Sequence, residues 1–272
     1  MFGISIDDSR RIIQAIHAHY RLDLSGYLIN SFRFRISKIL DKHHIKNIEQ
    51  LIDRLLEDET YFDEFLYEIS AGSTEMFRDP PMWLSLSIQF LPDLFKRKGT
   101  PVFWFPRCVS GDELFSLLIL LKEIDALKDC QIFVSTLSFK SLYLIKNGEL
   151  HRSKLTISQD NYLDAGGKNE FNSYFKEKNK LILLNSSLIK GVQFKRQDHN
   201  LTGMKEEADV IFIRNQLLNY NSLLKEKLLD FFTQKLSQGG LLILGQKETI
   251  QTKNISNNFI PIHHEEAIYQ KK

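Results

Sequence analysis

The stretch VFWFPRCVSGDELFSLLILL, residues 102–121, decides the fold of this chain. It begins with the apolar run 102–105, passes through Pro106 and Gly111, and continues as the helix-like run 114–121. A strand that ends in a glycine-containing turn and opens a helix places backbone N–H groups and the positive helix end at one edge of a sheet. Ligands bind at this edge in α/β proteins, although an ordinary βα loop has the same pattern.

Three further apolar runs, residues 131–135, 208–213 and 241–244, have the length and continuity of buried strands. An amphipathic helical pattern over residues 223–236 precedes the last of them, and the Gly239-Gly240 pair ends that helix. Alternating strands and helices predict βαβ units. We therefore expect an α/β fold with a mainly parallel sheet.

Residues 149–195 interrupt this alternation. They contain many polar residues, the Gly166-Gly167 pair and the short apolar run 180–184. We interpret them as an inserted subdomain with a small antiparallel sheet. The tail after about residue 250 is polar, and we expect it to be peripheral.

Residues 8 to about 70 have helical periodicity, because apolar side chains such as Ile12, Ile16 and Tyr20 recur on one helix face. This part contains no proline, which favours an all-helical unit. The predicted division is a helical domain over residues 1–80 and an α/β domain over residues 81–272, with the insert at about 149–195.

The composition is that of an ordinary globular protein, with 43% hydrophobic and 26% charged residues among 272. A formal net charge of +2 gives no overall field that favours nucleic acid or membrane. The two cysteines and eight histidines show no spacing typical of a metal site. No apolar run reaches the roughly 18 residues of a membrane span, and the first residues lack a signal-peptide pattern, so we expect a cytoplasmic monomer.

Five segments stand out in order along the chain. They are residues 73–80 (STEMFRDP), 104–116 (WFPRCVSGDELFS), 132–138 (IFVSTLS), 198–201 (DHNL) and 209–221 (DVIFIRNQLLNYN). Together they resemble the motifs of the CheR-type chemoreceptor methyltransferases, which use S-adenosylmethionine (SAM). The resemblance extends from about residue 10 to 250, and five motifs in family order are far more specific than any one of them.

The resemblance implies a Rossmann-like SAM methyltransferase sheet with an N-terminal all-helical domain and a small inserted β subdomain. It implies methyl transfer from SAM to glutamate side chains of a chemoreceptor-like protein, with S-adenosylhomocysteine (SAH) as the product. The partner would be a helix or tail of that receptor. The insert at 149–195 would correspond to the family's subdomain for docking the receptor tail.

The resemblance also carries site residues over to this sequence. Those expected to bind the cofactor are Thr74, Gly111, Glu113, Thr136, Asn200, Leu201, Asn215 and Gln216, and those expected to act in catalysis are Arg78 and Tyr220. A fixed cation at Arg78 can orient the acceptor carboxylate during in-line transfer. Without the other motifs, a surface ion pair of Arg78 with Asp79 or Glu75 would be the favoured interpretation.

Four positions depart from the family pattern, namely Gly72, Arg107, Thr136 and Asn219. Arg107 replaces a small residue, commonly glycine or alanine, and would either point to solvent or fill space meant for the cofactor. Thr136 replaces the carboxylate that holds the ribose, a loss of about 1.5–3 kcal/mol, or roughly ten- to a hundredfold in affinity. The family tyrosine aligns with Asn219, so Tyr220 replaces it only if the turn shifts.

Two functions therefore stay open. One is a SAM-dependent methyltransferase, and the other is a catalytically impaired pseudoenzyme that serves as a protein-binding or scaffold module on the same fold. Nucleic-acid methylation is disfavoured by the low net charge and by the absence of an Asn/Asp-Pro-Pro-aromatic motif. The basic side chains Arg33, Arg35 and Lys38 fit a contact with an acidic receptor segment or a solvated helix face.

Overall fold

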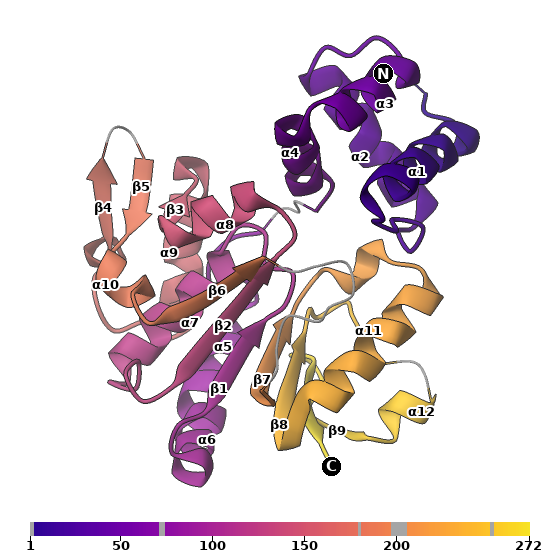
Figure 1. The fold of residues 1–272 in the computed structure, drawn as a ribbon. Helices are drawn as coiled ribbons and strands as arrows, with labels where there is room; N and C mark the ends of the chain where they lie inside the picture. Colours follow the sequence, from indigo (N-terminus) through magenta and orange to yellow (C-terminus); the bar gives the residue numbers. More distant parts are fainter. Residues whose placement is uncertain (1–2, 71–73, 179–180, 197–205, 251–252) are drawn as a thin grey trace.

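The computed structural model describes residues 3–70, 74–178, 181–196, 206–250 and 253–272. It has an N-terminal group of helices beside an α/β unit that is built around a seven-stranded sheet (Figure 1). Among the described residues, no helix has the length and apolar character needed to cross a membrane.

The N-terminal group consists of four helices, as the helical periodicity predicted. They are α1 (Ile6–Tyr20), α2 (Ile29–Lys42), α3 (Ile48–Glu57) and α4 (Glu59–Ser70). The recurring apolar side chains form their shared core, with Ile12 and Ile16 fully buried. Helix α1 begins with a capping box, in which the Ser5 hydroxyl accepts the Asp8 N–H and the Asp8 carboxylate accepts the Ser5 N–H.

The main sheet has the strand order β6-β2-β1-β7-β8-β10-β9. The strands are β1 (Val102–Phe105), β2 (Gln131–Thr136), β6 (Val192–Arg196), β7 (Ala208–Ile213), β8 (Leu236–Leu244), β9 (Phe259–His263) and β10 (Ile268–Lys271). The first five of these are parallel to one another, whereas β10 is antiparallel to both β8 and β9. The expected α/β fold, with four of its strands placed from apolar runs, is confirmed.

Both faces of the sheet are covered, which explains why its strands are continuously apolar. On one face Trp104 packs against Phe232 of α11 (Ser222–Lys235), and Figure 1 shows this helix in front of β7 and β8. On the other face Phe103 and Phe105 belong to a second core with the helices that precede and follow β1. These are α5 (Pro80–Ser85), the π-helical turn Leu86–Phe90, α6 (Leu91–Lys98) and α7 (Asp112–Glu123).

The α/β unit begins earlier in the chain than we predicted. Met76 and Phe77 are buried in the second core, together with Trp83 and the insert. The helical group therefore ends near Ser70 rather than at residue 80, because the apolar side chains that follow it pack on the sheet.

The insert forms a separate three-stranded antiparallel sheet in the order β3-β5-β4. Its elements are β3 (Glu149–Leu150), the 3-10 turns Arg152–Lys154 and Phe171–Tyr174, α9 (Leu155–Asp164), β4 (Phe175–Lys178), β5 (Leu181–Leu184) and α10 (Ser186–Ile189), and α8 (Phe139–Lys146) precedes it. The expected end at about residue 195 is too late. Strand β6 pairs with β2 at the edge of the main sheet, where its polar side chains face solvent.

The C-terminal tail is not peripheral, contrary to our prediction. After α12 (Lys253–Ser256), β9 and β10 complete the main sheet, and Ile268 of β10 is fully buried between β8 and β9. The pattern hid these strands because they are short and half polar. Pro261 is tolerated because β9 is an edge strand.

The helical group is docked on the α/β unit by backbone hydrogen bonds. Leu28 donates to the carbonyl of Asn219, and Asn221 donates to the carbonyl of Gly26, each at 2.8 Å. At a second point Asp63 accepts the first two N–H groups of α8 at 2.7 and 2.8 Å. These contacts hold the helices over the carboxyl edge of the sheet.

Candidate functional site

A cavity lies between the helical group and the carboxyl ends of β1 and β7. Its walls come from the loop after β1 (residues 105–113), the loop after β7 (residues 212–220) and the end of α4. Tyr27 and Thr74 add the side toward the helical group. This is the position at which open α/β sheets bind their ligands.

Four non-glycine residues around the cavity have left-handed backbone conformations. They are Phe77, Asp79, Arg107 and Asn215, with φ between 52° and 56°. Such a conformation costs a non-glycine residue about 1–2 kcal/mol, so each needs a compensating contact. Phe77 N–H donates to the Ser116 hydroxyl at 2.8 Å, and the other three are held by the contacts described below. Strain of this kind concentrates at functional sites.

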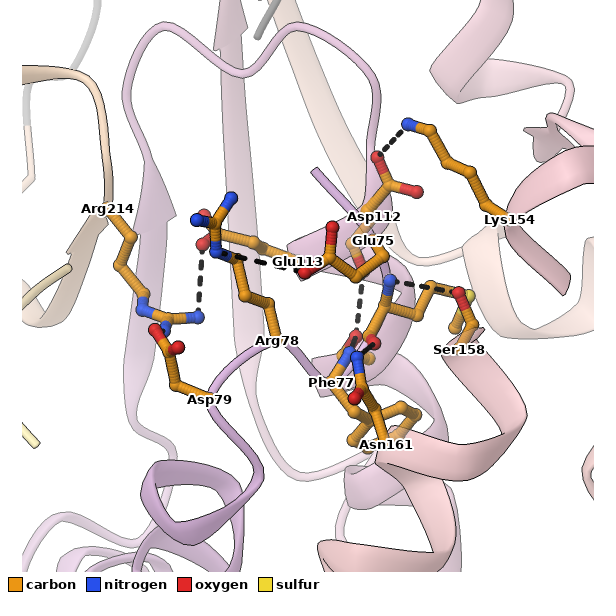
Figure 2. Close-up of polar contacts among 12 residues, drawn as sticks. Glu75, Phe77, Arg78, Asp79, Asp112, Glu113, Lys154, Ser158, Asn161 and Arg214 are labelled. Carbon is orange, nitrogen blue, oxygen red and sulfur yellow. Dashed lines mark hydrogen bonds and ion pairs between the residues drawn. The ribbon is translucent and has the colours of Figure 1, made fainter. Parts of the chain in front are cut away.

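A buried ion triad joins three of the sequence motifs. The Arg214 side chain, only 1% exposed, donates to Asp79 at 2.5 Å and to Glu113 at 3.2 Å (Figure 2). Burial raises the pKa of Glu113 to about 7, against the opposing effect of the Arg214 charge. Arg214 therefore links the ends of β7 and α7 to the residue that opens α5.

The sequence allows two surroundings for Arg78, a position beside the acceptor or a surface ion pair with Asp79 or Glu75. Its Nε lies 3.8 Å from Glu75, and its carbonyl accepts the Trp83 indole N–H at 3.0 Å. Asp79 is directed instead to Arg214 (Figure 2). Arg78 does not line the cavity among the described residues, but its charge lowers the pKa of Glu113. It thus lies near the cavity rather than in its wall.

Helix α9 of the insert holds the segment that carries Arg78. The Ser158 hydroxyl accepts the Met76 N–H at 3.2 Å, and the Asn161 amide donates to the Met76 carbonyl at 3.1 Å (Figure 2). Lys154 pairs with buried Asp112 at 3.3 Å. These contacts were not predicted, because no local pattern links residues that are 42 to 85 positions apart.

Arg107 and Tyr220 meet inside the cavity. Arg107 Nη1 donates to the Tyr220 hydroxyl at 3.2 Å, and Tyr220 packs edge-on against Tyr27 of the helical group. Asn219, at the position of the family tyrosine, also lines the cavity, but its side chain is held by α2. Its Oδ1 accepts from Ser31 at 3.0 Å and from Arg35 at 3.2 Å. The turn therefore directs Tyr220, and not Asn219, toward Arg107.

The structure brings six of the sequence-predicted residues together around the cavity. These are Thr74, Gly111, Glu113, Asn215, Gln216 and Tyr220. Asn200 and Leu201, with the departure Gly72, lie outside the described residues.

Thr136 is not brought to the cavity. It is fully buried, and its hydroxyl donates to the Ser138 carbonyl at 3.1 Å. Ser138 and Ser141 line the cavity at this strand end, and their hydroxyls lie 3.1 Å apart. Sequence reasoning missed both, although a serine just before a helix is a recognisable N-cap.

Glu248 is a third residue that sequence reasoning missed. It is buried, and its carboxylate accepts the N–H groups of Asn215 and Gly245 at 2.7 Å each and that of Leu218 at 3.2 Å. Burial raises the pKa of Glu248, while these three bonds favour its ionised form. Glu248 therefore fixes the left-handed backbone at Asn215.

Thiolate or metal chemistry finds little support at the cavity. Burial raises the pKa of the Cys108 thiol in its wall to about 12. Away from the cavity, His43, Glu64 and Glu68 bring three potential ligands together, but Lys42 already pairs with both carboxylates and Lys140 with Glu64.

Comparison with known proteins agrees with this architecture. A family model described as the CheR methyltransferase all-alpha domain matches residues 7–70, and one described as the CheR methyltransferase SAM-binding domain matches residues 72–266. A Pseudomonas putida protein that carries the name Cher3 and a methyltransferase description is 29% identical, with 96% of each chain aligned. A chemotaxis protein methyltransferase of Listeria monocytogenes is 24% identical over 84% of this chain and 85% of its own.

Among solved structures, the N-methyltransferase NodS from Bradyrhizobium japonicum, in complex with SAH, aligns with 72% of this chain and 90% of its own. The identity is 9% and the TM-score is 0.37, so this likeness adds nothing to the assignment.

Proposed function

Since this chain belongs to the CheR methyltransferase family, we propose that it transfers the methyl group of SAM to glutamate side chains of a chemoreceptor-like protein. One observation carries the proposal. Six residues that the family motifs singled out, from separate segments of the chain, line one cavity at the carboxyl edge of the sheet.

The cofactor is SAM, as the description of the matching domain states. The location of the cavity and the hydrogen-bonding groups around it both suit a nucleoside-type cofactor. The N-terminus of α7 opens into it with its positive end, and the amide side chains of Asn215 and Gln216 and the hydroxyls of Ser138 and Ser141 lie in its wall. We propose that these groups hold the cofactor.

When bound, SAM supplies a methyl group on a cationic sulfur, which departs as the neutral thioether of SAH. The chain's own residues have three tasks in this proposal. The helical group, docked through Leu28 and Asn221, covers the cavity and excludes water. Arg78 orients the acceptor carboxylate, which is already ionised at neutral pH and needs no general base. The triad of Arg214, Asp79 and Glu113 fixes the loops around the cavity in position.

The acceptor belongs to the proposal as well. Proteins named chemotaxis methyltransferases are among the relatives of this chain, which supports a helix or tail of a chemoreceptor-like protein as the partner. We propose that the tail docks on the inserted sheet β3-β5-β4. We also propose that the protein is a cytoplasmic monomer that neither binds nucleic acid nor inserts into a membrane.

Specific contacts also favour the second candidate, a binding or scaffold module without turnover. Thr136 has its hydroxyl bonded to a backbone carbonyl, away from the cavity. The Arg107 side chain extends into the cavity wall, and Asn219 is held by Ser31 and Arg35 of α2. If each of these changes weakens SAM binding by roughly ten- to a hundredfold, the protein keeps its fold but binds SAM too weakly for catalysis.

Calorimetric titration with SAM and SAH separates the two candidates. The informative variant is Asn215→Gly, because glycine keeps the backbone at φ 56° and the N–H bond to Glu248 while it removes the amide. Asn147→Gly, at the exposed end of α8, is the matched control.

Micromolar binding that the control retains and Asn215→Gly weakens at least tenfold supports the enzyme. Transfer of labelled methyl from SAM to a glutamate-containing receptor peptide completes the test. Absence of heat at millimolar SAM and SAH rules out the methyltransferase and leaves the scaffold module.

A further inference from the structure

In the part of the chain that the structure describes, Arg107 lacks an acidic partner, unlike Arg214, which also lines the cavity. Arg214 is bonded to the carboxyl groups of Asp79 and Glu113, and Lys154, outside the cavity wall, is paired with Asp112. Within the described ranges, no Asp or Glu oxygen lies within ion-pair distance of Arg107. Its side-chain hydrogen-bond partner in these ranges is the Tyr220 hydroxyl and not a carboxylate.

The guanidinium of Arg107 also retains an unused donor. Its Nε is buried and has no hydrogen-bond partner among the described residues. The Tyr220 and Tyr27 rings lie beside it, and Cζ of Arg107 is 5.6 Å from the centroid of the Tyr220 ring. A buried cation with an unmet N–H donor costs free energy unless an anion completes it. Planar guanidinium groups accept carboxylates through two parallel bonds, one of which Nε can donate.

The backbone at Arg107 indicates that this side chain is retained at a cost. Its φ of 55° is one that glycine adopts without strain, and the family pattern has a small residue here. An arginine that was neutral for function would therefore be disfavoured. Tyr220 holds the guanidinium in the cavity and acts as its positioning residue.

We propose that Arg107 binds a carboxylate group of a ligand in this cavity. The inference rests on the proposed function, which offers two such groups. One is the amino-acid carboxylate of the cofactor, and the other is the side chain of the acceptor glutamate. In either case Arg107 determines specificity in a way that the small family residue cannot.

The test compares ligands that differ in this carboxylate. SAH and 5′-methylthioadenosine, which lacks the amino-acid part, are titrated calorimetrically into the wild type, Arg107→Gly and Arg107→Lys. Glycine relieves the left-handed strain, so the variant is not expected to unfold, and a thermal melt checks this. Arg97→Ala, at an exposed ion pair with Asp93 on α6 and away from both the cavity and the insert, is the matched control.

If Arg107 holds the cofactor carboxylate, Arg107→Gly weakens SAH binding roughly ten- to a hundredfold and leaves methylthioadenosine binding unchanged. If it holds the acceptor, both nucleosides bind as before. The KM for the glutamate peptide then rises by a similar factor while kcat changes less. Arg107→Lys recovers part of either loss, because it restores the charge without the planar fork.

Two results overturn the inference while the proposed function survives. One is tighter SAH binding by Arg107→Gly, which means that the guanidinium fills space the cofactor needs. The other is wild-type behaviour of Arg107→Gly toward both nucleosides and the peptide. A wild-type protein that binds neither SAM nor SAH overturns the proposed function itself, and this inference with it.

Discussion

Replacing Glu113 by glutamine should change how the stability of the protein depends on pH. Glu113 is the carboxyl in which burial and an ion pair compete most directly. Its side chain is 15% exposed and lies 3.2 Å from Arg214, yet its pKa rises from the ordinary 4.5 to about 7. Burial therefore outweighs the attraction of Arg214, whose charge Asp79 already neutralises at 2.5 Å.

The sign and size of the effect follow from proton linkage. Between pH 4.5 and 7 the folded protein retains the Glu113 proton, whereas the unfolded chain has released it. Stability contributed by this group is thus present at low pH and is lost as pH rises through 7. At about 1.4 kcal/mol per pH unit, the loss amounts to about 3 kcal/mol. Glu113→Gln does not titrate, so its stability relative to the wild type should improve by this amount between pH 4.5 and 8.

Urea unfolding of both proteins at several pH values measures the difference, with fluorescence of the buried Trp83 and Trp104 as the signal. A difference that does not vary with pH would refute the reasoning. A difference that grows in favour of the wild type at high pH would show that Arg214 outweighs burial.

A companion variant, Asp79→Asn, tests the same ion triad by removing the other negative charge that faces Arg214. Asparagine tolerates the left-handed backbone at this position, so the change removes mainly the charge. At pH 5, where Glu113 is protonated, Arg214 loses its counterion and the free energy of unfolding should fall by about 3–5 kcal/mol. At pH 8 the ionised Glu113 replaces it, and the same urea experiment should find a smaller loss. Equal losses at both pH values would contradict the charge balance described for this triad.

Two further outcomes test the docking of the helical group and the state of the thiols. Gly26→Ala should destabilise the protein by about 1–3 kcal/mol in thermal or urea unfolding, because the new Cβ would lie 2.4 Å from Leu224 Cδ2. Gly191→Ala, where nothing lies within 4 Å, should change stability by less than about 0.5 kcal/mol, and equal effects would contradict this packing. Cys108 and Cys130, whose pKa values burial raises to about 12, should not react with a disulfide reagent at pH 8 until the chain is denatured. Rapid reaction of either folded thiol would show that it is accessible.

Much of the fold could be predicted because local patterns encode it. Continuous apolar runs identified four strands, since a parallel sheet with both faces covered needs no alternation. The last two strands, β9 and β10, were missed for the converse reason. They are short and half polar, and they become recognisable as strands only when β10 pairs with β8 and β9 pairs with β10.

The site was predicted less completely. Motif order identified the residues that gather at the cavity, such as Gly111 and Asn215, but it could not identify their partners. The Arg214–Asp79 bond joins residues 135 positions apart, and the three N–H groups that Glu248 accepts come from two loops. Contacts between residues so far apart in the chain form only when the chain is folded, and no short window of sequence reveals them.

The sequence by itself determined the ancestry and the architecture of this protein. Segments 73–80, 104–116 and 209–221 resemble the family motifs in residue type and in order. These motifs lie at strand ends, where the local chemistry of the site requires particular residues. Only the tertiary structure decided which side chains face the cavity. It placed Arg107 against Tyr220 and turned Asn219 to the helical group, because the direction of a side chain depends on the backbone of its turn and on the unit that docks against it.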